Sequence, residues 1–155
     1  LLLGTFYTSS TTTTEDSATN RLVGNVYNKV RRACFGSNTT SHTNTNATAH
    51  EINNGTGMTR GNFVTSMGAQ QLDLYLMCTM SRTGNSVGYL QAAFDTTTTS
   101  FDMGNSWLYS GSAIQINYGH SQLVSTVGKH YLTILESGVA GVTYVSAYVR
   151  AVLEM

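Results

Sequence analysis

The feature that most constrains this chain is a strict alternation of apolar residues between positions 71 and 81. Every second residue in that stretch is apolar, namely Leu72, Leu74, Leu76, Cys78 and Met80. Successive side chains of a β-strand point to opposite faces of the sheet, whereas an α-helix repeats about every 3.6 residues. The period of two therefore predicts a β-strand with one apolar face.

A second extended segment follows this strand closely. The intervening residues are rich in turn formers and include a glycine, and residues 87–94 then place Leu90, Ala92 and Phe94 on one face. Two strands joined by a loop of roughly five residues that contains a glycine usually form a β-hairpin. We therefore predict a hairpin over residues 71–95.

Similar extended segments continue to the end of the chain. They cover residues 61–67, 101–110, 112–118, 130–136 and 142–153. In the last of these, Val145, Ala147, Val149, Ala151 and Leu153 form one further alternating row. Gly, Asn and Ser turns separate the segments, and no regular strand–helix alternation is present. The pattern predicts an all-β fold, an antiparallel β-sandwich, and the jelly roll is the common eight-stranded form of it.

The first part of the chain has a different pattern. Within residues 15–36, apolar residues recur at helical spacing: Leu22, Val23, Val26, Tyr27 and Val30. Gly24, Asn25 and the β-branched residues are weak helix formers, so a helix and a short helical turn followed by a strand both remain open. We expect a partly helical N-terminal arm over residues 1–36 and a sandwich body over residues 37–155, together forming one compact domain. Residues 37–57 are polar and predict loops with at most one short strand.

The composition narrows the classes of partner. Only 10% of the residues are charged, and eight basic residues balance eight acidic ones. A neutral chain lacks the basic surface that binds phosphate backbones, so we expect no nucleic-acid partner. No apolar run approaches the roughly twenty residues that cross a bilayer, so we expect no membrane insertion. A surface with so few charges resists association weakly, which suits a protein that works in an assembly.

Cysteines and histidines provide little sign of chemistry. Two cysteines cannot define a disulfide framework, and Cys78 lies in an apolar row, which predicts a buried free thiol. No two of the four histidines have the close spacing of metal ligands, and no acidic cluster accompanies them: His42, His50, His120 and His130. We expect His42 and His50 to be exposed loop residues, and we predict no metal site and no cofactor.

The acidic residues do not indicate an active site. A glycoside hydrolase needs two carboxylates across a sugar, and the candidates here are Asp73, Asp95, Asp102 and Glu136. We expect Asp73 and Glu136 to point away from the core and Asp95 and Asp102 to lie in loops. A Ser/His/Asp triad leaves no reliable trace in a sequence, but the G-x-S-x-G elbow is missing. We predict that the chain is not an enzyme and has no catalytic residues.

The first 35 residues carry a likeness to a known family. They contain the motifs Leu3-Gly4-Thr5-Phe6-Tyr7-Thr8, Glu15-Asp16-Ser17 and Asn25-Val26-Tyr27-Asn28-Lys29-Val30-Arg31-Arg32. This order resembles the start of virion structural proteins of tailed bacteriophages, in which a Thr-rich β domain follows. The resemblance implies a component on the outer surface of a phage particle, such as a fibre, a spike or a capsid decoration protein.

A virion role implies oligomeric assembly and suggests where protomers meet. Virion parts are symmetric oligomers, so we expect a homotrimer that also contacts other virion proteins and could attach to a host-surface glycan. The second faces of two predicted strands carry large side chains that would serve as a protomer interface: Tyr75, Met77, Tyr144 and Tyr148. The alternative is that these side chains complete the core of a two-sheet sandwich.

A carbohydrate-binding, lectin-like β-sandwich module is the alternative function. Aromatic rings stack on sugar rings, and neighbouring amides and carboxylates bond the sugar hydroxyls. The candidate glycan contacts are Trp107, Tyr109, Asn105 and Asp102. The simpler interpretation of Trp107 is that it packs at the edge of the sandwich.

Overall fold

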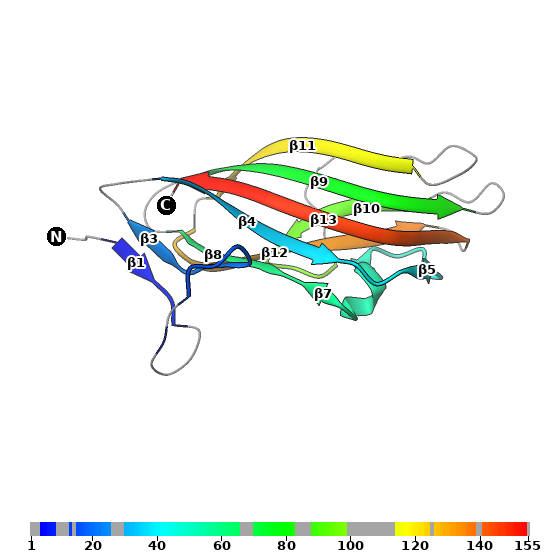
Figure 1. Ribbon diagram of the computed structural model, residues 1–155, viewed down its shortest axis with the longest axis horizontal. Coiled ribbons are helices and arrows are strands. Elements are labelled where there is room, and N and C mark those ends of the chain that lie inside the picture. Colours follow the sequence, from blue (N-terminus) through cyan, green and yellow to red (C-terminus); the bar gives the residue numbers. More distant parts are fainter. Residues whose placement is uncertain are drawn as a thin grey trace.

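A computed structural model describes residues 4–8, 13, 15–25, 30–65, 70–82, 88–98, 114–124, 126–138 and 141–154. Within these residues the chain is all-β: it forms strands and one short 3₁₀ helix, η1 (Ile52–Gly55). The strands build two larger sheets that pack against each other and one small ribbon of two strands (Figure 1). The predicted all-β class is confirmed. No helix in this described part of the chain is long and apolar enough to span a bilayer.

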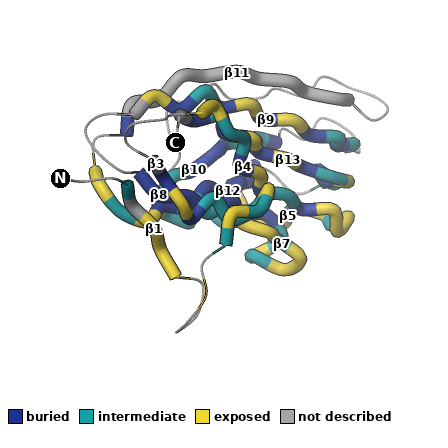
Figure 2. The backbone as a smooth tube through the Cα atoms, turned by 60° about the vertical axis from the view of Figure 1, so that its left-hand side comes forward, coloured by how far each residue is buried: buried dark blue, intermediate teal, exposed yellow. Residues whose placement is uncertain are grey.

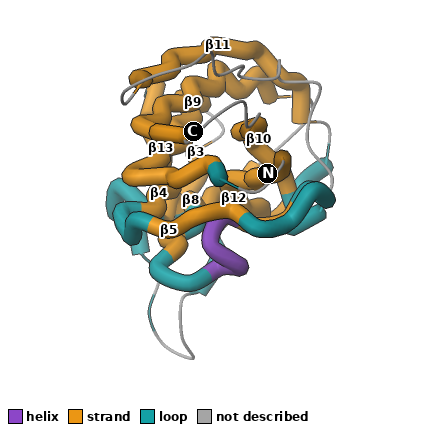
Figure 3. Tube along the Cα trace, turned by 90° about the vertical axis from the view of Figure 1, so that its right-hand side faces the viewer, coloured by secondary structure: helices purple, strands orange, loops and turns teal. Residues whose placement is uncertain are grey.

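The four long strands of the larger sheet form the upper layer in Figure 1. Its strand order is β11 (Ile114–Val124), β9 (Gln70–Arg82), β13 (Val142–Glu154), β4 (Arg31–Asn38) and β7 (Met58–Thr59), and β5 (His42–Asn44) also pairs with β13. All of these pairs are antiparallel. Figure 3 shows that this sheet curves around the interior.

The second sheet packs beneath the first. Its strand order is β10 (Gly88–Phe94), β12 (Gly128–Gly138), β8 (Gly61–Thr65) and β2 (Asn20–Arg21), and β6 (His50–Glu51) pairs with β12 beyond the end of β8. Only the short β2–β8 contact is parallel among the named pairs. The remaining ribbon consists of β1 (Gly4–Phe6) and β3 (Val23–Asn25), at the end of the molecule where β13 finishes.

The core lies between the two sheets and follows the predicted alternation. In β9 all five residues of the apolar row are 0–2% exposed, while Tyr75 and Met77 between them face outward. In β10, Leu90 and Ala92 are buried, and Phe94 is partly buried against the same core. Figure 2 shows the buried positions alternating with exposed ones along the strands. The strand prediction at positions 71–81 is confirmed.

The predicted hairpin between β9 and β10 is not formed. β9 pairs with β11 on one side and with β13 on the other, so it has no edge free for β10. β10 pairs instead with β12 in the opposite sheet. The chain therefore passes from one sheet to the other between β9 and β10. Each strand lies in its own sheet, and both strands turn their apolar rows toward the core between the sheets.

The predicted helix in the N-terminal arm is also not found in the described residues. β2, β3 and β4 occupy residues 20–21, 23–25 and 31–38, and the apolar residues Val26 and Tyr27 lie outside the described part. In β4, Cys34, Gly36 and Asn38 are buried while Phe35 is exposed, which is a period of two. Pairing with β13 along the whole of β4 outweighs a helical spacing built on weak helix formers. The expected boundary at residue 36 falls inside this strand.

A β-bulge in β13 reverses which residues face the core. Tyr144 pairs with Met80 and Ser146 pairs with Thr79, so Val145 is an extra residue without a partner in β9. The residue before the bulge, Tyr144, is buried, and Val145 is 40% exposed. After the bulge the buried positions are Ala147, Val149, Ala151 and Leu153. The predicted alternating row is thus confirmed from Ala147 onward and wrong at Val145, since one inserted residue shifts the alternation by one.

Two glycines allow the sheets to approach at one point. A Cβ atom on Gly36 would lie 2.9 Å from the carbonyl oxygen of Thr59 and 3.1 Å from the nitrogen of Gly61. A Cβ atom on Gly61 would lie 3.0 Å from the carbonyl carbon of Phe35. These contacts are with backbone atoms, which cannot turn away. Any side chain at either position would push β4 and β8 apart.

Candidate functional sites

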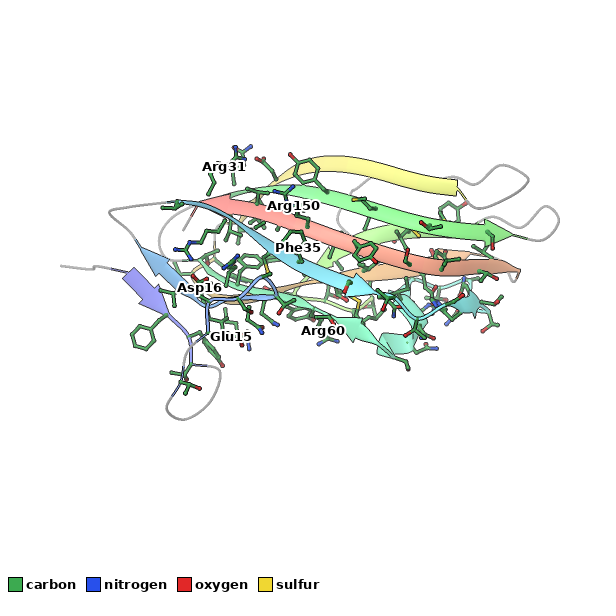
Figure 4. The ribbon with its side chains drawn as sticks, in the orientation of Figure 1. Glu15, Asp16, Arg31, Phe35, Arg60 and Arg150 are labelled. Atoms are coloured by element: carbon green, nitrogen blue, oxygen red, sulfur yellow. The ribbon has the colours of Figure 1, made fainter. Side chains whose placement is uncertain are left out.

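An exposed group of large side chains covers the outer face of the larger sheet. On β13, Arg150 pairs with Phe35 of β4 on one side and with Tyr75 of β9 on the other. Its guanidinium carbon lies 5.8 Å from the Phe35 ring centroid and 5.7 Å from the Tyr75 ring centroid, within cation–π distance. Figure 4 shows Phe35 and Arg150 on this layer.

A second row lies two residues along the same strands. Tyr148 of β13 pairs with Met77 of β9, so these side chains point to the same face as Arg150 and Tyr75. We call Phe35, Tyr75, Met77, Tyr148 and Arg150 the aromatic face. Its four uncharged members are 38–45% exposed. A contiguous exposed apolar patch of this kind commonly marks a contact surface.

Three of the four residues predicted to face outward therefore do so. The fourth, Tyr144, is 1% exposed, and its hydroxyl donates to the carbonyl oxygen of Tyr89 at 2.9 Å. The bulge at Val145 is the reason, because it places Tyr144 and Tyr148 on opposite faces although they are four residues apart. The prediction that Tyr144 belongs to a protomer interface is wrong for this conformation.

The candidate glycan contacts cannot be placed. Asp102, Asn105, Trp107 and Tyr109 all lie outside the described residues. The sugar-binding hypothesis stays a prediction.

A buried carboxylate with two histidines lies between the two packed sheets at one end of the molecule. Glu136 of β12 is 1% exposed, and its Oε2 lies 2.6 Å from Nε2 of His42. Its Oε1 lies 3.1 Å from Nε2 of His50 and accepts the backbone N–H of Asn53 at 2.9 Å. We call His42, His50 and Glu136 the His–Glu cluster. Both histidine side chains are largely buried, at 12% and 16% exposure.

Two sequence predictions are corrected by this cluster. Glu136 points into the interior, because it shares its strand face with the buried Leu132 and Ile134. His42 and His50 are not freely exposed, because β5 and β6 bring them to that carboxylate from the two sheets. The signal that sequence reasoning passed over is a repeated Thr-x-His, in which each ring Nδ1 faces the carbonyl oxygen of the threonine two residues earlier.

The charge of Glu136 in this cluster contributes to the raised pKa values of two neighbouring side chains, Tyr144 and Cys78. The Tyr144 ring stacks on His42 with centroids 5.5 Å apart. Burial, and then the charge of Glu136, raises the pKa of the Tyr144 phenol far above its usual range. Burial, with a smaller contribution from Glu136, raises the pKa of the Cys78 thiol to about 12. Both neighbours therefore stay neutral at physiological pH.

A second network joins a carboxylate, an imidazole and a hydroxyl. His130 places Nδ1 2.6 Å from Oδ2 of Asp95 and Nε2 3.0 Å from Oγ1 of Thr65. This is the order of a nucleophilic triad, but Thr65 is fully buried and its hydroxyl donates to the carbonyl oxygen of Thr126 at 2.5 Å. The Phe94 ring stacks on His130 at 4.8 Å. In this conformation the network packs β8, β10 and β12 together.

The other predicted residues are placed as follows. Asp73 is partly exposed on the outer side of β9, as predicted, and pairs with Arg31. Cys78 is a buried free thiol, as predicted, and so is Cys34, whose pKa burial raises to about 12. The His120 side chain lies outside the described part. Among the described residues, no group of three His, Cys, Asp or Glu side chains is arranged to hold a metal ion.

Comparison with protein-family models and with curated protein sequences found no match.

Proposed function

We propose that this chain is a structural protein on the outer surface of a tailed-phage particle and that it works by assembling with copies of itself. The observation that carries the proposal is the aromatic face, with four large uncharged side chains exposed around one arginine. The likeness of the first 35 residues to phage virion proteins gives the setting. A fibre, spike or capsid decoration protein would use such a face between protomers.

The strand order supports the further proposal that the sandwich is a jelly roll. In the numbering of a jelly roll, β4 would be the first strand, β8 the second, β9 the third and β10 the fourth. β11, β12 and β13 would be the sixth, seventh and eighth. The jelly roll places first, eighth, third and sixth strands side by side, which is the observed order β4-β13-β9-β11. It faces them with second, seventh and fourth, which is the observed order β8-β12-β10. The described residues contain no strand in the fifth position, and residues 99–113 between β10 and β11 are not described.

A second copy of the chain is the partner that fits the aromatic face best. The chain is neutral overall, so no strong field would attract a charged partner. The face itself presents both a cation and aromatic rings, the two halves of a cation–π contact. If three copies meet with their aromatic faces at a three-fold axis, the arginine of each copy can contact the aromatic rings of the next. We therefore propose a homotrimer.

The contribution of one residue can be worked out for Tyr148. Full burial of an aromatic side chain removes about 150–250 Å² from water. Tyr148 is 42% exposed, so an interface could bury roughly 60–100 Å² more. At about 25 cal/mol per Å² this gives about 2 kcal/mol per copy, or roughly a 30-fold change in the dissociation constant.

The test is the solution mass of the purified chain by light scattering after size exclusion. We expect three protomers of 16.7 kDa for the wild type and dissociation in Tyr148→Asp, with an unchanged circular dichroism spectrum. Val127→Asp is the matched control, since Val127 is an exposed apolar residue between β11 and β12, away from the aromatic face. A monomeric wild type at all concentrations, or equal dissociation in both variants, would refute assembly through this face.

The virion setting has its own test. Antibodies raised against the purified chain should label intact phage particles, and mass spectrometry of washed particles should detect it. Absence of the chain from the particles would refute the setting even if the trimer is found.

A further inference from the structure

Arg150 lies in the middle of the aromatic face, and among the described residues the N–H groups of its guanidinium have no acceptor. Its contacts are with the rings of Phe35 and Tyr75 on the two neighbouring strands. A cation–π contact uses the charge of the guanidinium but leaves its five N–H donors without acceptors. The side chain is exposed, so in a single copy these donors face water.

In this respect Arg150 differs from the other arginines. Asp73 is the acidic residue on this face of β9, two residues from Tyr75, but Arg31 already pairs with its carboxylate. Each of the other arginine side chains that the structure describes has a carboxylate partner: Arg21 and Arg32 pair with Asp16, Arg31 with Asp73, and Arg60 with Glu51. Within this described set, Arg150 is the arginine that has no counter-charge.

A second copy of the chain has no spare carboxylate among the described residues. Each carboxylate side chain that the structure describes already accepts from a donor in its own chain: Glu15, Asp16, Glu51, Asp73, Asp95 and Glu136. A carboxylate that moved to Arg150 of another copy would leave its present donor without an acceptor, which cancels much of the gain. The counter-charge for Arg150 therefore comes from outside these side chains.

Assembly through the aromatic face would remove the water around Arg150. A guanidinium that loses its hydration needs acceptors in exchange, because burial of an unpaired charge is strongly unfavourable. A three-fold axis increases this need, since it brings the positive charges of three copies toward one another. An interface made only of the described groups would be incomplete at this point.

Building on the trimer proposed above, we propose that the aromatic face binds one small oxyanion on the three-fold axis, held by the Arg150 guanidinium of each copy. The chemical class is that of inorganic phosphate. The planar guanidinium matches the oxygens of phosphate or carboxylate, which a chloride ion does not provide. Phosphate also has three equivalent oxygens around one P–O bond, so each copy can donate to one of them.

The neighbours of Arg150 suit this role. Phe35 and Tyr75 have ring centroids 5.8 Å and 5.7 Å from its guanidinium carbon, one on each side. A ring on each side limits sideways movement and leaves the outward direction open, where another copy would lie. Tyr148 and Met77 form the next row of the same face. Once buried, these apolar groups would exclude water from the ion, which strengthens its contact with the guanidinium groups.

The proposal predicts that phosphate promotes assembly. A ligand that binds only the assembled state shifts the equilibrium toward that state. With one phosphate for three chains, the monomer–trimer dissociation constant should fall by up to tenfold for each tenfold rise in phosphate.

The test is light scattering of a dilution series in inorganic phosphate and in chloride at the same ionic strength. The wild type should form a tighter trimer in phosphate, and Arg150→Met, which keeps the length of the side chain without its charge, should lose this difference. Arg60→Met is the matched control and should keep it, because Arg60 also lies over an aromatic ring, that of Tyr131 at 4.9 Å, but pairs with Glu51.

The outcomes separate this proposal from the proposed function. A wild-type trimer that is equally stable in phosphate and chloride, or a phosphate effect that survives in Arg150→Met, overturns the anion site and leaves the trimer standing. A wild type that stays monomeric in both salts refutes the proposed assembly, and the anion site with it.

A second measurement applies if Arg150→Met does not assemble. Equilibrium dialysis with radiolabelled phosphate counts the bound ions above and below the chain concentration at which the wild-type trimer dissociates. We expect one phosphate for three chains above that concentration and none below it. A trimer that binds no phosphate, or a monomer that binds as much per chain as the trimer, overturns the proposal.

Discussion

Replacing Tyr144 with phenylalanine tests the reversal of facing that the bulge in β13 produces. The ring would keep its place in the core, where it is 1% exposed, and only the hydroxyl would be lost. That hydroxyl donates to the carbonyl oxygen of Tyr89 at 2.9 Å and lies 3.3 Å from the carbonyl oxygen of Ser137. The change therefore deletes the bond by which Tyr144 connects the larger sheet to β10 and β12.

The expected cost follows from the burial of these partners. A typical internal hydrogen bond contributes about 0.5–1.5 kcal/mol net, and a buried acceptor left without its donor costs about 1–3 kcal/mol. We expect the free energy of unfolding to fall by about 2 kcal/mol in Tyr144→Phe. For a domain of this size that corresponds to a fall in Tm of about 4–8 °C.

Tyr148→Phe is the matched control on the same strand. Its hydroxyl belongs to a side chain that is 42% exposed, so its loss should change the stability by no more than about 0.5 kcal/mol. Denaturant unfolding followed by circular dichroism measures both variants, at a concentration where the wild type is monomeric. A neutral Tyr144→Phe beside a destabilising Tyr148→Phe would show that the facing of β13, and the aromatic face with it, is wrong.

Two further predictions test the packing. Gly36→Ala should lower the free energy of unfolding by about 1–3 kcal/mol, because its Cβ would meet the Thr59 carbonyl oxygen at 2.9 Å, whereas Ser37→Ala next to it should be nearly neutral in the same denaturant titration. The thiols of Cys34 and Cys78, whose pKa burial raises to about 12, should resist iodoacetamide at pH 8 in the folded chain and react in denaturant, as mass spectrometry will show; rapid alkylation of the folded chain would contradict their burial.

Local alternation predicted the strands that the structure describes from residue 61 onward, but it missed the short strands before residue 61, including β5 and β6 in the predicted loop, and it did not predict how the strands pair. The row from Leu72 to Met80 fixes both the conformation of β9 and its buried face. Pairing depends on which strand occupies each edge, and the partners of β9 come from residues 114–124 and 142–152, far along the chain. Nothing near residues 83–87 carries that information, so the predicted hairpin failed while its two strands were confirmed.

The N-terminal arm failed for a related reason. The spacing of Leu22, Val23 and Val30 fits a helix, but burial in β4 has a period of two and depends on its partner β13. Helical spacing of apolar residues in a short segment is weak evidence for a helix, because pairing with a strand from elsewhere in the chain can override it. Of the two alternatives that the sequence left open, the one that ends in a strand lies nearer to the structure.

The candidate sites show where pattern and chemistry disagree. In β12, Glu136 lies on the same strand face as Ile134 and Leu132, two and four residues away, and this face is buried. We predicted that Glu136 points to solvent because its side chain is charged, and that prediction was wrong. In β13, a regular alternation would put Tyr144 and Tyr148 on the same face of the strand. The bulge at Val145 puts them on opposite faces, and no sequence pattern predicted that bulge.

These two departures belong to one site, because His42 both bonds to the Glu136 carboxylate and stacks on the Tyr144 ring. Its ring lies 94 residues before Glu136 in the chain, so no local pattern could have predicted the contact. Proteins tend to break local rules where a residue is kept for a specific interaction rather than for packing alone. The buried Glu136 carboxylate, the two histidines and the inward Tyr144 ring are such a departure, so we expect a specific interaction, and not packing alone, to keep them at this end of the two packed sheets.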